Sequence, residues 1–167
     1  KGVSEGGTFV KVTGVGFSHR SAQMSLLACR FNLTLVMAVF VSSNEIHCIA
    51  PQNPTGCVAV EVSNNVQDFS EDGVLYEYVA MQLHSVLPSS GPIAGNSLVK
   101  VRGHNLFPTS SKGLYCQFGD MAPMEATYES ASQLRCASAV STQAGTVAIH
   151  IINNGAISTS SLAYKYE

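Results

Sequence analysis

The sequence predicts an all-β protein made of two tandem β-sandwiches. Three observations support this fold class: an internal duplication, apolar residues that alternate with period two, and clusters of Gly, Pro, Ser and Asn at short intervals. Many short strands, separated by turn residues roughly every ten positions, are typical of a β-sandwich.

The duplication appears as five landmarks that recur in the same order. Their offsets stay between 87 and 89 residues, and surface loops can absorb so small a drift. The matching segments are residues 8–14 with 97–103, CRF at 29 with CQF at 116, Cys48 with Cys136, CVAVEVSNN at 57 with TVAIHIINN at 146, and YEY at 76 with YKY at 164. We therefore expect one domain over residues 1–79 and another over residues 80–167.

Alternating apolar residues indicate strands with one face on a core. In VAVEV, Val58, Val60 and Val62 face one way and the residues between them face the other. VAIHI, residues 147–151, repeats the pattern in the second copy. No segment has a helical period, so no helix is expected.

The longest apolar run is LTLVMAVFV, residues 33–41. A helix needs about 20 apolar residues to span a bilayer, so this run is too short to be a transmembrane segment. It is rich in Val, Leu and Phe and ends at SSNE, and we predict a buried strand.

Composition argues against several classes of protein. Charged residues make up 12% of the chain, about half of the roughly 25% usual for soluble domains. The net charge of −2 provides no basic stripe, which argues against nucleic acid and anionic membranes as partners. The chain starts at Lys1 without a Met or a leader, and we expect it to be a segment of a larger protein.

No residues form a catalytic pattern. The five histidines are scattered, and the sequence has no H-E-x-x-H, G-x-S-x-G, Walker or dinucleotide-binding motif. The sequence therefore predicts neither an enzyme nor a cofactor.

The five cysteines divide into two equivalent pairs and one remainder. Cys29 and Cys48 match Cys116 and Cys136, so we predict the disulfides Cys29–Cys48 and Cys116–Cys136. Each closes a loop of about twenty residues and would stabilise a small domain by roughly 3 kcal/mol in the chain-entropy model. Four buried free thiols are the alternative.

Cys57 has no counterpart, because Thr146 occupies its position in the second copy. The alternation places Cys57 on the face opposite to the valines, near the surface. In a secreted protein such a thiol predicts an intermolecular disulfide, and a half-buried free thiol is the alternative.

Asn32 begins the sequon Asn32-Leu33-Thr34, whereas Asn53 is followed by Pro54 and is not an acceptor. The sequon aligns with Gly119 and the following residue, where a turn is expected. We predict an N-linked glycan on Asn32 of the secreted protein, with an unused sequon as the alternative.

A polar segment before the last strand of the first copy partly matches a calcium loop. Asp68, Ser70, Asp72 and Gly73 fit positions 1, 3, 5 and 6 of the EF-hand pattern. Position 12 is Val79, where a bidentate Glu is needed. A polar turn is therefore the preferred interpretation over a calcium site.

Taken in order, these motifs resemble an IPT/TIG domain, an immunoglobulin-like sandwich of the E-set type. The second copy carries them as SVLPSSGPIAGNSLVKVRGHNLF, CQF, LRC, TVAIHIINN and AYKY, and the first as GGTFVKVTGVGF, CRF, IHCIAP, VEVSNN and FSEDGVLYEY. The resemblance covers nearly the whole chain. The first copy lacks the opening S-x-x-P-x-x-G-P, so we expect its first strand to be truncated.

Similar domains occur in plexin and scatter-factor-receptor ectodomains, in Rel-type transcription factors, in starch-degrading enzymes and in surface proteins of protists and bacteria. Fold alone does not settle the role. The nine basic residues are dispersed and outnumbered by eleven acidic ones, which argues against a DNA-binding module of the Rel type.

The paired cysteines, the sequon and the low charge predict a non-enzymatic structural or adhesive segment of a larger extracellular or cell-surface glycoprotein made in the secretory pathway. A surface so poor in charge is expected to be covered in part by other subunits or sugar, as in a filament or surface coat. The expected partners are other protein subunits, neighbouring IPT/TIG domains of the same chain, and glycans, without direct membrane insertion. The alternative is a receptor ectodomain stalk that binds a specific protein ligand.

Overall fold

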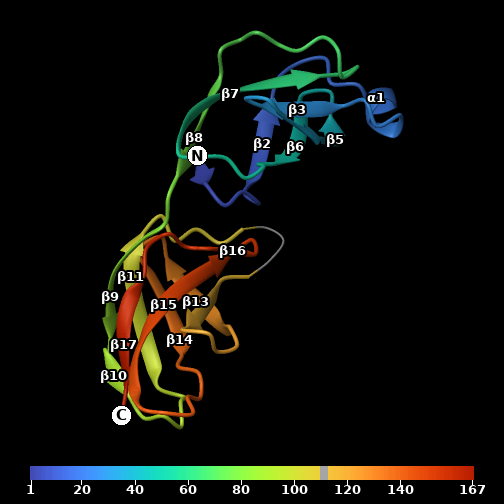
Figure 1. Cartoon of the computed structure of the whole chain (residues 1–167). Coiled ribbons are helices and arrows are strands. Elements are labelled where there is room, and N and C mark those ends of the chain that lie inside the picture. The colour runs from blue at the N-terminus through green and yellow to red at the C-terminus, as the bar shows by residue number, and fades with distance from the viewer. Residues whose placement is uncertain (110–112) are drawn as a thin grey trace. The chain divides into compact units, whose positions relative to one another are not determined.

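The computed structural model describes residues 1–109 and 113–167 and divides the chain into two compact units, Lys1–Val79 and Ala80–Glu167. Both units are built from β-strands, which confirms the all-β fold class (Figure 1). In the part of the chain that the structure describes, no helix is long and apolar enough to cross a membrane.

Unit 1 is a sandwich of two sheets. One sheet has the order β1-β8-β7-β3-β4 and the other the order β2-β6-β5. β1 pairs with β8 in parallel, and β2 and β6 are antiparallel. The strands are β1 (Gly2–Val3), β2 (Phe9–Thr13), β3 (Ala28–Phe31), β4 (Thr34–Met37), β5 (Val39–Ser42), β6 (Glu45–Ile49), β7 (Gly56–Ser63) and β8 (Leu75–Val79).

The core of unit 1 lies between these sheets. Val58, Val60 and Val62 of β7 pack against it, as the alternation predicts. The buried members of this core are Phe17, Leu27, Cys29, Phe31, Ile46, Cys48, Ala50, Tyr76 and Tyr78.

A short helix, α1 (His19–Gln23), follows β2, although the sequence analysis expects no helix. The hydroxyl of Ser18 caps it by accepting the backbone N–H of Ser21 at 3.2 Å. The helix makes only about one and a half turns, too few for an apolar period to appear in the sequence.

The prediction of a buried strand over residues 33–41 is wrong. The run forms two edge strands, β4 on one sheet and β5 on the other. At Ala38 the chain passes between the sheets, and the N–H of Ala38 donates to the carbonyl of Leu27 at 3.0 Å. One set of alternate residues, Val36, Ala38 and Phe40, packs against the core. The other set is exposed: Leu33, Leu35, Met37, Val39 and Val41.

Unit 2 repeats this arrangement with three differences, one of which is the short strand β16 that pairs with β15. β13 is continuous and pairs with both β12 and β14, so it takes the place of β4 and β5 and joins the two layers. β9 pairs with β11 on the side opposite to β14. The strands are β9 (Gln82–Leu87), β10 (Ser90–Gly91), β11 (Leu98–His104), β12 (Tyr115–Phe118), β13 (Met124–Ser130), β14 (Gln133–Ala137), β15 (Gly145–Asn153), β16 (Ala156–Ile157) and β17 (Leu162–Tyr166).

The buried side chains of unit 2 match those of unit 1 in kind. Phe118 packs edge-on against Tyr164, with ring centroids 5.3 Å apart, as Phe31 packs against Tyr76 at 5.4 Å. Ile149 and Ile151 of β15 have no exposed surface, in agreement with the alternation seen in the sequence. The two copies therefore bury the same faces of the same strands.

Candidate interaction surface

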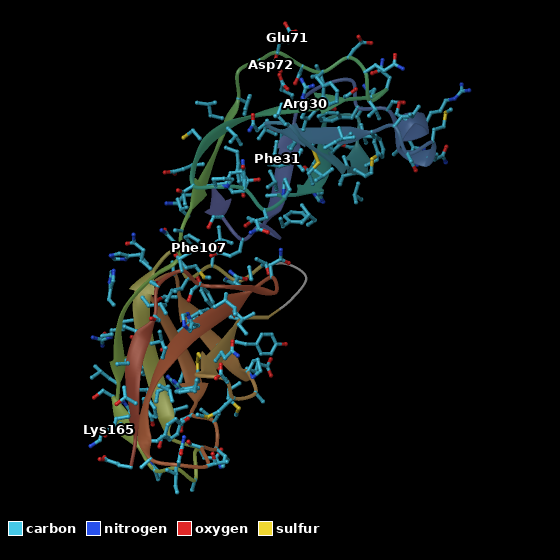
Figure 2. The ribbon with its side chains drawn as sticks, viewed as in Figure 1. Arg30, Phe31, Glu71, Asp72, Phe107 and Lys165 are labelled. Atoms are coloured by element: carbon cyan, nitrogen blue, oxygen red, sulfur yellow. A yellow bond between two sulfur atoms is a disulfide. The ribbon has the colours of Figure 1, made fainter. Side chains whose placement is uncertain are left out.

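Two disulfides, Cys29–Cys48 and Cys116–Cys136, lie in the interiors of the two units (Figure 2). Cys29 lies on β3 and Cys48 on β6, so this bond joins the two sheets of unit 1. In unit 2 the bond joins β12 to β14, the two neighbours of β13. Each disulfide thus crosses the core that its flanking strands form.

Cys57 is a free, exposed cysteine near the start of β7. Its cross-strand partner is Glu77 on β8. The thiol is therefore accessible from solvent on the outer face of the sheet, on the side away from Val58.

Asn32 lies in the tight turn between β3 and β4. Its φ of 54° is in the left-handed region, which Asn adopts more readily than most residues. Gly119, its counterpart in unit 2, has the same φ of 54°. Asn32, Leu33 and Thr34 are all exposed, so the whole sequon projects from the turn.

The structure places the three oxygen-bearing residues of the calcium candidate in separate roles. The hydroxyl of Ser70 accepts the N–H of Val62 at 3.1 Å, and the carboxylate of Asp68 accepts a hydrogen bond from the Asn65 amide at 2.7 Å. Asp72 lines a cavity beside β2. Within residues 1–109 and 113–167, no group of three or more His, Cys, Asp and Glu side chains is placed to hold a metal ion.

The exposed members of the apolar run form a surface that we call the β4–β5 surface: Leu33, Leu35, Met37, Val39 and Val41. The most exposed of them is Leu33, with 89% of its surface accessible, next to the sequon residue Asn32. Because these residues alternate along two edge strands, their side chains point away from the core. The apolar composition of the run predicts an interior strand, so this surface cannot be found from the sequence alone.

Further exposed apolar residues lie on the outer face of the sheet that contains β5. Phe9 on β2 and Ile49 on β6 are cross-strand partners, and both are exposed. The ring of Phe9 packs edge-on against His47, with centroids 4.5 Å apart. Val39 of the β4–β5 surface is in turn the cross-strand partner of His47.

The same sheet face carries one compact charge network. Glu45 forms a salt bridge with Lys11 at 2.6 Å and contacts the Nε2 atom of His47 at 2.8 Å. The hydrogen bond from Lys11, and then that from His47, holds the pKa of the Glu45 carboxyl below its usual value. Lys11 and Glu45 thus pair with each other beside the exposed apolar side chains of Phe9 and Ile49.

Comparison with known proteins places these features in a family. The family model of the IPT/TIG domain matches residues 1–78 and again residues 81–166. Plexin-A3 of the rat is 25% identical over 173 residues, which cover 99% of this chain and 9% of the plexin. Human Plexin-A3 is 27% identical over 111 residues, which cover 63% of this chain and 6% of the plexin. The chain therefore spans less than a tenth of these relatives.

Solved structures show the same fold. The full extracellular region of Plexin A4 matches 99% of this chain with a TM-score of 0.68 and 19% identity, over 17% of the plexin chain. A second structure of that region gives a TM-score of 0.66 and 21% identity, over 15% of its length.

The two matched structures are of the extracellular region of Plexin A4, and disulfides such as the two in this chain occur mainly in secreted and cell-surface proteins. In ectodomains of the plexin type, IPT/TIG domains are typically non-catalytic. Because the family match extends over both units, the chain belongs to the IPT/TIG domain family, of which it contains two tandem members.

Proposed function

We propose that the chain is a non-enzymatic structural or adhesive segment of a larger extracellular multi-domain glycoprotein, and that the β4–β5 surface joins it to other subunits of a filament or surface coat. The single observation that carries this proposal is the exposure of the β4–β5 surface on two edge strands. Exposed apolar side chains on unpaired edge strands offer a place for another chain to bind.

The edge strands lack the usual protection against contact with other chains. Natural sheet edges are blunted by Lys, Pro or inward-pointing charges, because their free N–H and C=O groups can pair with another strand. Residues 33–42 contain no charged residue and no Pro. This supports a role in which another protein subunit covers the edge.

Two covalent features fit the same role. A glycan on Asn32 would cover the Leu33 end of the β4–β5 surface and leave the Val39 end open to a neighbour. A disulfide from Cys57 to another subunit would fix such a contact covalently, because the thiol is exposed.

Light scattering at rising protein concentration tests the proposal. We expect the chain without its glycan to self-associate. The double variant Leu35→Glu, Val39→Glu should remain monomeric, because self-association would bury the two introduced carboxylates in the contact between chains. Val140→Glu is the matched control, because Val140 is an exposed apolar residue of unit 2. A wild-type chain that stays monomeric at millimolar concentration would contradict the proposal.

The second candidate is a receptor ectodomain stalk that binds a specific protein ligand. The similarity to Plexin-A3, which extends over 99% of this chain, favours it. In that case the wild-type chain stays monomeric. It binds a protein ligand on cells from its native source, and the Leu35→Glu, Val39→Glu variant loses this binding although its mass in solution is the same as that of the wild type.

A further inference from the structure

One outer surface of unit 2 is rich in cations. Its residues lie on three neighbouring strands, β9, β11 and β14, in alternation with buried residues such as Val99, Val101 and Cys136. Their side chains therefore point away from the core. We call this surface the basic face: His84, Lys100, Arg102 and His104, which are exposed, and Arg135, which is half-buried.

The pairing of the strands brings these side chains together. Lys100 of β11 is the cross-strand partner of Arg135 on β14, and like charges in directly opposed positions destabilise a sheet. Arg102 and His104 follow Lys100 along β11 in steps of two residues, about 7 Å each. The ring of His84 packs edge-on against that of His104, with centroids 4.4 Å apart. The basic face is thus a row of groups and not a single charge.

One carboxylate offsets part of this charge. Glu129 of β13 accepts hydrogen bonds from the Gln133 amide and from Nη2 of Arg135. The hydrogen bond from Gln133, followed by the charges of Arg135 and Lys100, holds the pKa of the Glu129 carboxyl below its usual value. Arg102 donates to the neutral amide oxygen of Gln133 at 3.4 Å. Among the described residues, neither Lys100 nor Arg102 forms a salt bridge.

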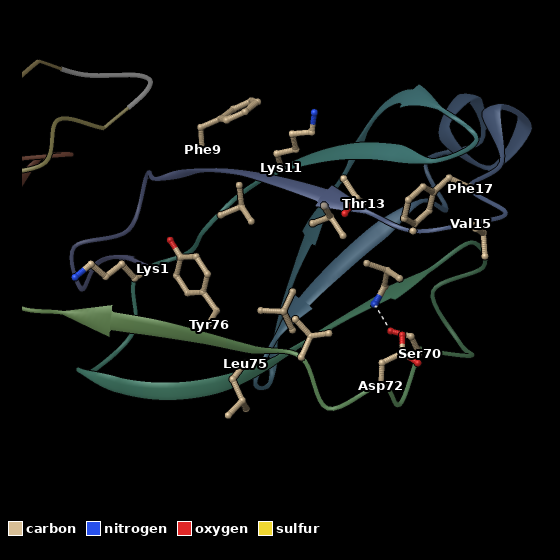
Figure 3. Close-up of a pocket in the computed structure, with 16 residues that line it drawn as sticks. Lys1, Phe9, Lys11, Thr13, Val15, Phe17, Ser70, Asp72, Leu75 and Tyr76 are labelled. Atoms are coloured by element: carbon tan, nitrogen blue, oxygen red, sulfur yellow. Dashed lines mark hydrogen bonds between the residues drawn. The ribbon is translucent and has the colours of Figure 1, made fainter.

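Unit 1 shows that the fold does not require cations at these positions. The residues 89 positions before Arg102 and His104 are Thr13 and Val15, which line the cavity beside β2 (Figure 3). Both are uncharged. The row along β11 is therefore a property of unit 2 and not of the shared sandwich.

The acidic partner differs between the units as well. In unit 1, Glu45 pairs with Lys11 at 2.6 Å. Lys100 matches Lys11, but Gln133 stands at the position that matches Glu45. Compared with unit 1, unit 2 thus has more cations on this side of the sheet and lacks the carboxylate that would neutralise them.

The composition of the whole chain conceals the basic face. Unit 1 contains seven acidic and four basic residues, whereas unit 2 contains four acidic and five basic ones. The net charge of −2 therefore averages an acidic unit with a slightly basic one. A local field depends on where charges lie and not on their sum.

From this arrangement we infer that the basic face of unit 2 binds a glycan chain that carries sulfate groups. The guanidinium of Arg102 can pair with an oxyanion through two parallel hydrogen bonds, and Lys100 adds a compact positive charge. The ring N–H groups of His84 and His104 can donate to further oxygens of the same chain. A row of donors suits an extended polymer better than a single small anion.

The surroundings of Arg102 favour a glycan over a protein partner. Protein interfaces usually bury an aromatic or apolar anchor near their centre. The cross-strand neighbours of Arg102 are the polar residues Ser85 and Gln133. The exposed side chain of Leu87 lies at the end of the face, opposite Lys100.

The choice among polyanions rests on the extracellular location proposed above. Nucleic acids and the anionic leaflet of the plasma membrane lie on the cytoplasmic side. Sulfated glycans are the polyanions of the extracellular side. Binding to a purified polymer tests the basic face itself, and its result does not depend on where the protein lies.

A titration with dextran sulfate at several salt concentrations tests the inference. We expect the chain to bind dextran sulfate and not unsulfated dextran. Lys100→Gln with Arg102→Gln should weaken binding about tenfold and lower the slope of log K against log salt by about two, because two cations no longer displace counterions. Both side chains are exposed, so the melting temperature should stay that of the wild type.

Lys11→Gln with Arg20→Gln is the matched control, because it removes the same charge from unit 1. This control should bind dextran sulfate as the wild type does. An equal loss of binding in the control, or a wild type that does not bind or binds dextran equally well, overturns the inference.

A second copy of the chain is the rival partner, because unit 1 is acidic. A wild type that self-associates through the basic face without binding dextran sulfate, and loses this association in the Lys100→Gln, Arg102→Gln variant, overturns the inference. The Leu35→Glu, Val39→Glu variant separates the two surfaces. It should bind dextran sulfate as the wild type does, whether or not the β4–β5 surface associates.

Discussion

Arg30 on β3 and Glu61 on β7 are cross-strand partners whose salt bridge places two guanidinium nitrogens on one carboxylate oxygen. Nε donates at 2.8 Å and Nη2 at 2.5 Å. The guanidinium also lies over the ring of Phe69, 3.9 Å from its centroid. The cation is thus held by an anion and an aromatic face together, on the outer side of the sheet.

The first prediction concerns this salt bridge. Glu61→Gln should lower the free energy of unfolding of unit 1 by about 0.5–1 kcal/mol, because a partly buried charge pair loses its anion. Glu167→Gln removes a similar but more exposed contact with Lys165 and should have almost no effect. Urea denaturation measures both, and equal effects would show that the Phe69 contact and partial burial add nothing.

The second prediction concerns acid stability. The pKa of Glu45 lies below its usual value of 4.5, because Lys11 and His47 hydrogen-bond to its carboxylate. A lowered pKa in the folded state means that the stabilisation is present above pH 4.5 and is lost as pH falls through the lower value. The melting temperature of the wild type should therefore drop more between pH 5 and pH 3 than that of Glu45→Gln.

Glu71→Gln is the matched control for this experiment, because Glu71 is an exposed carboxyl in the loop before β8 (Figure 2). It should retain the acid sensitivity of the wild type. Identical melting profiles for the wild type and Glu45→Gln would count against a stabilising role of the Lys11–Glu45–His47 network.

The third prediction separates the paired cysteines from the free one. The double variant Cys116→Ser, Cys136→Ser should lower the free energy of unfolding of unit 2 by about 2–4 kcal/mol, because the unfolded chain gains conformational entropy when the cross-link is removed. Cys57→Ser should leave stability unchanged, since its thiol is exposed and unpaired in the described chain. Unreduced peptide mapping of native-source protein would then show whether Cys57 is bonded to a foreign peptide, and a free thiol there would end the proposal of a covalent link.

The fourth prediction concerns the glycan. Asn32 should be glycosylated when the chain is secreted from eukaryotic cells, because the sequon is exposed in a tight turn. Removal of N-glycans should lower the mass of the wild type but not that of Thr34→Ala. Asn53 is the internal control and should stay unmodified, because Pro54 follows it. A wild type without sugar would refute the prediction.

Most of the fold could be predicted from period-two alternation, because a strand with one buried face repeats its side-chain environment every second residue. Val58, Val60 and Val62 could therefore be oriented correctly from the sequence. The run from Leu33 to Val41 could not, because it is apolar on both faces and no period distinguishes an interior strand from an exposed edge. A helix as short as α1 leaves no period either, and only its cap at Ser18 could have revealed it.

The duplication gave information that no single copy contains. It aligned Asp72 with Ser160 and Gly14 with Gly103, so each unit became a reference for the other. The partial exposure of Val10 and Val12 could not be predicted from the sequence, because both residues have the same apolar character whether a neighbouring strand covers them or not.

The disulfides between layers also determine how each module would respond to a pulling force. Cys29 and Cys48 are 19 residues apart, and Cys116 and Cys136 are 20 apart. The segment between the two cysteines of each module therefore cannot be extended by force while the disulfide is intact. At about 3.4 Å per residue, roughly 65 Å of chain stays locked in each module. A tether made of such modules would lengthen less under load than an unbridged one, and a reducing environment would release the stored length.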